Sequence, residues 1–137
     1  MTEPGAQAQP PDGFEPAVSR APFAQHNGPF FDRASPEGLP QRAFHVLRRH
    51  TNGLGVVHGG MLATFMDGVL AMSLPRGGVT VNLSLDYLRM ARAGDWIVGE
   101  SRLLRAAGDL AFVEGRAFVG PHDVVRASGV FKLMRRA

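Results

Sequence analysis

The sequence predicts an α+β domain in which a curled antiparallel sheet wraps around one long helix. An apolar stretch over residues 58–74 has helical periodicity, and four long β-rich segments follow it. The connections between these segments, "RAGD", "AAGD" and "GPHD", are as short as those of antiparallel hairpins. Because strands and helices do not alternate along the chain, the pattern argues against a parallel sheet.

The helical stretch is unusual because its apolar side covers more than half of its circumference. A helix of this kind must be wrapped by a sheet. Its apolar residues are Met61, Leu62, Phe65, Met66, Val69, Leu70 and Met72, and the opposite narrow face carries Gly60, Thr64, Asp67 and Ala71. Such small residues let another backbone or a narrow ligand come close, and Asp67 points into that gap. A carboxylate in a buried helix needs compensating neighbours or a chemical role.

The β-rich segments are expected to form strands over residues 79–90, 95–106, 110–119 and 124–134. In "VTVNLSLDYL", apolar residues from Val79 to Tyr87 alternate with polar ones, which is typical of a half-buried strand. Before the helix, "QRAFHVLRRH" predicts one more strand and "TNGLG" a turn. Residues 17–26 predict a short helix that is followed by an extended piece.

The N-terminal region differs in composition from the rest of the chain. Eight of the ten prolines lie within the first 40 residues, and "MTEPGAQAQPPDG" has no apolar periodicity. We therefore expect residues 1–13 to form a disordered tail and residues 14–137 to form a single domain.

Composition also limits the function. The absence of cysteine excludes disulfides and thiolate metal sites, and no His, Asp or Glu cluster has ligand spacing, so we expect no metal. No secretory leader is recognisable and no apolar run approaches the ~20 residues of a membrane span, which predicts a cytoplasmic protein without membrane contact. The net charge is only +3 and the basic residues are scattered. This pattern argues against nucleic acid and suits a phosphate-bearing small molecule better.

The segment "N-x-x-G-x-x-H-G-G", followed by an acid directly after "ATFM", carries a family resemblance. Together with "NLSLDYLRMARAGD" downstream, it resembles the hotdog-fold acyl-CoA thioesterases of the phenylacetate-pathway, PaaI-like branch. The resemblance covers about residues 20–135, and it implies a sheet wrapped around a central helix at about 58–74. The residues that support it are Asn52, Gly55, His58, Gly59, Gly60 and Asp67.

The resemblance implies hydrolysis of an acyl- or aryl-acyl-CoA thioester, and the residue chemistry agrees. Hydrolysis needs donors for the developing oxyanion and a group that attacks or activates water. Gly59 would lie in the first helical turn, where its backbone N–H can polarise the carbonyl. Asp67 is the candidate general base or nucleophile, and the two roles stay open. Asn52 could hold the water or the substrate carbonyl.

Further residues have supporting roles in this hypothesis. We assign His58 to orientation of the loop rather than to proton transfer. Thr80 is the candidate for the Ser or Thr that the family often has near the start of the strand after the helix. Gly60, Asn82 and Arg89 are assigned to substrate binding. Coenzyme A would be part of the substrate, so no cofactor is expected.

The unfilled sheet edge and the small-residue helix face predict a homodimer formed by strand pairing, doubled to a tetramer. The resemblance implies that Asp67 and Asn52 of one site come from different chains. The main alternative is a hotdog protein that senses acyl-CoA without turning it over, although the first 40 residues cannot form a helix-turn-helix. A hotdog hydratase ranks lower, because Asp67 lies well inside the helix. The acyl group is not determined by the sequence.

Overall fold

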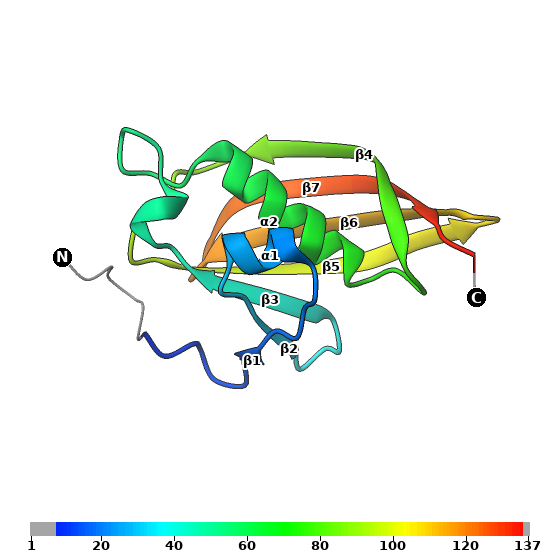
Figure 1. Ribbon diagram of the computed structural model, residues 1–137, viewed down its shortest axis with the longest axis horizontal. Helices are drawn as coiled ribbons and strands as arrows, with labels where there is room; N and C mark the ends of the chain where they lie inside the picture. The colour runs from blue at the N-terminus through cyan, green and yellow to red at the C-terminus, as the bar shows by residue number, and fades with distance from the viewer. Residues whose placement is uncertain (1–7, 136–137) are drawn as a thin grey trace.

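The computed structural model describes residues 8–135 and shows a seven-stranded antiparallel sheet that curls around one long helix, α2 (Figure 1). This confirms the predicted α+β hotdog fold. The helices are α1 (Pro22–Asn27), the 3-10 turn η1 (Arg48–His50) and α2 (Gly59–Ala71). The strands are β1 (Glu15–Pro16), β2 (Phe31–Ala34), β3 (Pro40–His45), β4 (Gly78–Tyr87), β5 (Trp96–Ala107), β6 (Leu110–Val119) and β7 (His122–Leu133).

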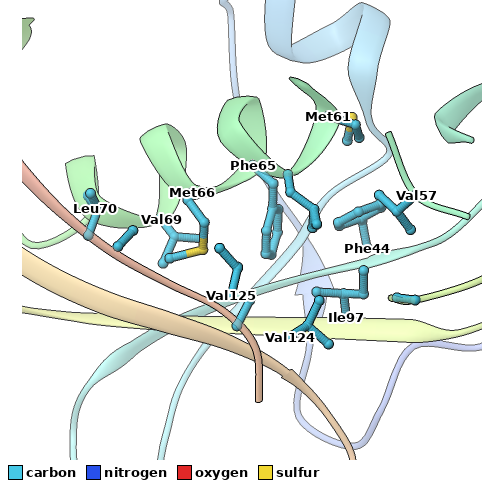
Figure 2. Close-up of a cluster of buried hydrophobic side chains, with 14 of the residues drawn as sticks. Phe44, Val57, Met61, Phe65, Met66, Val69, Leu70, Ile97, Val124 and Val125 are labelled. Atoms are coloured by element: carbon cyan, nitrogen blue, oxygen red, sulfur yellow. The ribbon is translucent and has the colours of Figure 1, made fainter. Parts of the chain in front are cut away.

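Helix α2 is held by the apolar side chains that it directs toward the sheet, as Figure 2 shows. Burial of such a side chain stabilises the fold by about 1.5–3 kcal/mol relative to exposure. Six of the seven predicted core residues of this helix are buried: Met61, Leu62, Phe65, Met66, Val69 and Leu70. Met72 is only half-buried, because the helix ends at Ala71 and Met72 is its C-cap.

Glycines in the sheet let α2 lie close to the strands. A Cβ atom at Gly99 in β5 would lie 2.8 Å from Val69 and 2.9 Å from Phe65 of the helix. Side chains at this position would therefore push the helix off the sheet. At Gly115 in β6, a Cβ atom would meet the backbone oxygen of Glu100 at 2.5 Å, so the sheet itself also requires glycine there.

The strand order differs from a simple meander. It is β1-β2-β3-β5-β6-β7-β4, so β5, β6 and β7 follow one another as predicted, whereas β4 pairs with β7 and lies at one edge. The chain returns from β4 to β5 past the start of α2. There the Val57 N–H donates to the Ala91 carbonyl, and Val56 forms a bridge with Arg92.

The alternation predicted for β4 holds only in its second half, whose leucines pack on the core. A β-bulge between Thr80 and Asn82 shifts the register of the first half. The prediction that Val79 and Val81 face the core is therefore wrong, and these residues are 55% and 61% exposed. Thr80 instead pairs with the buried Phe131 and points toward α2. A bulge inserts one extra residue, so the residues before it point to the opposite face of the sheet from the one that simple alternation predicts.

The segments before α2 are shorter than predicted. Helix α1 begins at Pro22 rather than near residue 17, because proline suits the first turn of a helix. Strand β3 ends at His45, where the chain leaves the sheet, and a 3-10 turn follows in which the Leu47 N–H donates to His50 Nδ1. Two further strands, β1 and β2, extend the sheet beyond β3.

The predicted tail falls only partly within the described residues. Residues 1–7 lie outside them, and residues 11–14 form a turn in which the Phe14 N–H donates to the Pro11 carbonyl. Arg33 of β2 donates to the Asp12 carbonyl and so joins this turn to the sheet. The boundary between tail and domain stays a prediction. Within residues 8–135, no helix has the length and apolar character needed to cross a membrane.

Candidate functional site

The loop before α2 is shaped by the side chain of Asn52. Its Oδ1 accepts hydrogen bonds from the Leu54 N–H at 2.9 Å and the Val56 N–H at 3.4 Å. This arrangement is typical of an Asx turn, in which a short side chain replaces a backbone acceptor. The Asn52 Nδ2 donors have no hydrogen-bond partner among residues 8–135. The amide therefore keeps the donor group that a carbonyl oxygen or a water molecule would accept.

His58 is the N-cap of α2, and its ring fixes the first turn. The imidazole Nδ1 accepts a hydrogen bond from the Gly60 N–H at 2.8 Å. This geometry supports an orienting function for His58. It also occupies the Gly60 N–H, whereas the Gly59 N–H lies at the first position of the helix, where no intrahelical acceptor exists. Of the two glycines, Gly59 is therefore the better donor for a ligand.

Tyr87 also contacts this turn, a contact that the sequence did not predict. Its hydroxyl donates to the Gly59 carbonyl at 2.8 Å, and its ring lies 3.5 Å from the position that a Gly59 Cβ would take. Tyr87 is the only tyrosine in the chain and ends an alternating strand on its inward face. An inward-facing aromatic residue with a hydroxyl group at the end of a strand is the sequence signal that could have revealed this contact.

Asp67 lies two turns further along α2, and its partner is Thr80. The Thr80 hydroxyl donates to Asp67 Oδ1 at 2.5 Å. The carboxylate is half-buried rather than fully buried, so its charge is compensated by this hydroxyl and by partial access to solvent. On the same narrow helix face, Thr64 is half-buried and Gly60 is exposed, so the chain itself leaves that face uncovered.

These residues form two groups. The helix-start half-site consists of Asn52, His58 and Gly59, and the carboxylate half-site consists of Asp67 and Thr80. Gly59 and Asp67 are eight residues apart, which corresponds to about 12 Å along a helix. A reacting carbonyl must lie about 3 Å from both its N–H donor and the attacking group. One chain therefore cannot act on a single carbonyl with both half-sites.

Two predicted substrate-binding residues lie away from these groups. Asn82 is exposed and alternates with Leu83, which packs on the core, so its side chain points away from α2. Arg89 follows β4, and its guanidinium donates to the Asp123 carbonyl at 3.3 Å. The structure thus brings Thr80 to Asp67, but it brings neither Asn82 nor Arg89 to that carboxylate.

A cavity of about 300 Å³ opens beside the first turns of α2. It lies between α1, η1 and the small-residue face of the helix. Its lining consists of His26, Asn27, Arg49, His50, Thr51, His58, Gly60, Met61 and Thr64. A hollow of about 600 Å³ at the other end of α2, near Met72, lies away from Gly59. The cavity beside α2 could therefore receive a group that is attached to a carbonyl bound at Gly59.

The described residues 8–135 contain no group of three or more His, Cys, Asp or Glu side chains that could hold a metal ion. The chemistry available in the two half-sites is that of a carboxylate, a hydroxyl, an amide and backbone N–H donors. Such a set suits acyl transfer to water. The expectation that no cofactor is needed stays a prediction.

Comparison with known proteins agrees with this chemistry. The family model described as the thioesterase superfamily matches residues 54–125, a range that includes Gly59, Asp67 and Thr80. The chain is 35% identical over 129 residues to a Pseudomonas aeruginosa protein with a provisional esterase name, covering 90% of this chain and 96% of that one. It is also 39% identical over 72 residues to mouse acyl-coenzyme A thioesterase 13, covering 49% of this chain and 51% of that protein.

Solved structures give the same result. A phenylacetic acid degradation-related protein of Ralstonia eutropha JMP134, described as a provisional thioesterase, superimposes with a TM-score of 0.72 at 26% identity. The superposition covers 84% of this chain and 92% of that protein. A match over 84% of this chain extends well beyond helix α2.

Proposed function

We propose that this chain, which belongs to the thioesterase superfamily, hydrolyses the thioester bond of acyl-CoA molecules. The observation that carries the proposal is the placement of Asp67. This carboxylate is half-buried, hydrogen-bonded to Thr80 and directed to a helix face that the chain does not cover. The similarity to mouse acyl-coenzyme A thioesterase 13 supports coenzyme A as the thiol part of the substrate.

In the proposed reaction, the thioester carbonyl oxygen accepts a hydrogen bond from the Gly59 N–H and a second one from the Asn52 amide. Asp67 either takes a proton from the attacking water or attacks the carbonyl carbon itself. When water attacks, the C–S bond breaks, coenzyme A leaves as a thiolate that gains the proton taken from the water, and the acyl group leaves as a carboxylic acid. When Asp67 attacks, the C–S bond breaks to leave a mixed anhydride on Asp67, and a water molecule then cleaves this anhydride, which releases the acid, restores the carboxylate and supplies the proton that the thiolate gains. The Thr80 hydroxyl holds the carboxylate in position throughout.

The proposed site is completed by a second copy of the chain. Gly59 and Asp67 of one chain lie about 12 Å apart along α2. The carboxylate that acts on a carbonyl bound at Gly59 must therefore come from another chain. Strand β4 pairs only with β7 among the described strands, and its Val79 and Val81 are exposed, so its free edge can pair with the same strand of another copy. A two-fold axis near Ala63, midway between Gly59 and Asp67, would bring Asp67 of the partner subunit to Gly59. Two such dimers would form the predicted tetramer.

The phosphates of coenzyme A need cationic partners, and the candidates in or beside the strands after α2 are Arg89, Arg92, Arg102 and Arg116. Arg102 is paired with Glu114, and Arg116 with Glu100 and Asp123. Among residues 8–135, the guanidinium groups of Arg89 and Arg92 have no carboxylate partner. We therefore assign these two arginines, both on the connection after β4, to the phosphates.

The test is a panel of acyl-CoA substrates that includes aryl-acetyl, benzoyl and medium-chain members. Purified protein should release free thiol from at least one of them, as followed with a thiol reagent. A folded protein that releases thiol from none contradicts the proposal. Tight binding by calorimetry without release would instead identify an acyl-CoA sensor. A cytoplasmic location, where coenzyme A is abundant, completes the proposal.

A further inference from the structure

We propose that Tyr87 is a positioning residue, which fixes the peptide between Gly59 and Gly60 and thereby aims the Gly59 N–H at the substrate. The inference rests on the proposed function, because it concerns the donor that polarises the thioester carbonyl. It assigns a task to a strand residue that lies outside both half-sites.

The geometry holds this peptide at both of its polar ends. Its carbonyl, which belongs to Gly59, accepts the hydrogen bond from the Tyr87 hydroxyl at 2.8 Å. Its N–H, which belongs to Gly60, donates to His58 Nδ1 at 2.8 Å. A peptide unit is planar, so two bonds on opposite sides fix the orientation of the whole plane.

Gly59 needs such restraint more than other residues would. Without a Cβ atom, its two backbone torsions have fewer steric limits, and the first position of a helix lacks an intrahelical bond to its own N–H. The preceding peptide is held through its carbonyl, because His58 O accepts from the Met61 N–H at 2.9 Å and the Leu62 N–H at 3.1 Å. With Tyr87 bound to the next peptide, both peptides that flank Gly59 are fixed.

Glycine at this position is not required by packing inside the chain. A Cβ atom at Gly59 would lie 3.5 Å from the Tyr87 ring, which is an ordinary contact, and the backbone has no positive φ. A glycine therefore leaves space for an approaching carbonyl, and the Tyr87 contact limits the freedom that glycine introduces. Tyr87 is itself 54% exposed, so its main contribution is not burial.

Strand β4 thus contacts the site region at two points. Thr80 near its start binds Asp67, and Tyr87 at its end binds Gly59. The strand runs opposite to α2, so the later strand residue meets the earlier helix residue. The two contacts are independent hydrogen bonds, and the one from Tyr87 can be removed without changing the other.

The experiment compares Tyr87→Phe with the wild-type chain. The variant keeps the ring and its packing on Gly59 but loses the hydroxyl. We expect kcat to fall roughly tenfold for the best substrate of the panel, with KM within about twofold and Tm within about 2 °C, because misaimed groups lose rate more than binding. Amide hydrogen exchange of the peptide that covers residues 52–62 should become faster.

The matched control is Asp86→Asn. Asp86 neighbours Tyr87 but points to the other face of β4, where it pairs with Arg126 at 3.0 Å, and both side chains are largely exposed. This variant should keep the wild-type kcat and the wild-type exchange of residues 52–62. A Tyr87→Phe enzyme with wild-type kcat and wild-type exchange would overturn the inference. If the wild-type protein hydrolysed no acyl-CoA, the proposed function would fail, while the exchange comparison would still decide whether Tyr87 fixes the helix start.

Discussion

The two half-sites are held in different ways. The helix-start half-site is tied by bonds inside its own loop, from Asn52 Oδ1 and His58 Nδ1, and by a bond from Tyr87. Among residues 8–135, Asp67 has one side-chain donor, Thr80, and it faces an uncovered surface. The chain therefore builds a rigid donor at one point of α2 and presents a carboxylate at another. In the proposed dimer, the carboxylate of one chain would meet the fixed donor of the other chain.

The largest expected effect follows from removal of the Asp67 charge. Asp67→Asn should lower kcat by about 10²- to 10⁴-fold, because the group that activates water or attacks is lost. Stability should be unchanged or slightly higher, since the amide oxygen can still accept the bond from Thr80. Steady-state kinetics and calorimetric Tm measure the two quantities. Near-normal turnover would refute the assigned function of Asp67.

The second prediction concerns the assembly of the two half-sites. Asn52→Ala should also lower turnover, though less than Asp67→Asn. If the half-sites meet across a dimer, co-expression of these two variants gives about half mixed dimers, each with one intact and one doubly defective site. Activity should then recover to about a quarter of wild type. Confirmed mixed dimers that stay as inactive as their parents would show that one chain supplies both residues.

The third prediction separates stability from activity at the helix start. Gly59→Ala should fold with an unchanged or higher Tm, because alanine favours a helix by up to about 1 kcal/mol and its methyl group meets the Tyr87 ring at ordinary contact distance. Turnover should fall roughly tenfold or more, since the methyl group obstructs the approach of a carbonyl to the N–H. Unchanged turnover in the variant would mean that no substrate comes close to Gly59.

The smallest effect is expected on the outer face of the sheet, at the turn between β5 and β6, because Lys132 is exposed and alternates with the buried Phe131. Lys132 hydrogen-bonds to Asp109 at 2.6 Å, and this bond and its charge hold the pKa of the Asp109 carboxyl below its usual value. The ion pair therefore favours the folded chain above the unfolded-state pKa, and this contribution is lost as the pH falls through the folded-state pKa.

Lys132→Met should raise the pKa of Asp109 toward its ordinary value, as measured by an NMR titration of the carboxyl group. Because both side chains of the pair are more than half exposed, overall stability should change little. Turnover should equal that of the wild type, since neither half-site contacts this pair. A loss of turnover would show that the half-sites depend on the outer face of the sheet.

Much of the fold could be predicted because its signals are local. The apolar period of α2 and the glycine turns between β5, β6 and β7 depend on neighbouring residues, and the structure agrees with them. The pairing of β4 with β7 depends on contacts between residues that are distant in sequence, so local pattern could not place this strand at the edge. The bulge between Thr80 and Asn82 was missed because a two-residue alternation cannot show that one residue leaves the ladder.

The candidate site was predictable to a similar degree. The spacing of Asn52, His58, Gly59 and Asp67 carried the family resemblance and marked the helix and its loop. Thr80 was a candidate from that resemblance alone, and its hydroxyl binds Asp67 in the structure. The contact of Tyr87 with Gly59 was not foreseen, because it joins a strand end to a helix start across 28 residues. The catalytic functions of these residues stay predictions.

The position of β4 at the edge of the sheet affects the response of the protein to heat. In a chain that has separated from its partner, β4 has a hydrogen-bonded neighbour on one side only, so it can leave the sheet with less disruption than β5, β6 or β7. Such a partial opening would release Thr80 from Asp67 and Tyr87 from Gly59 in the same event. Heating would then inactivate the protein before it melts, and cooling would restore activity without refolding of the core.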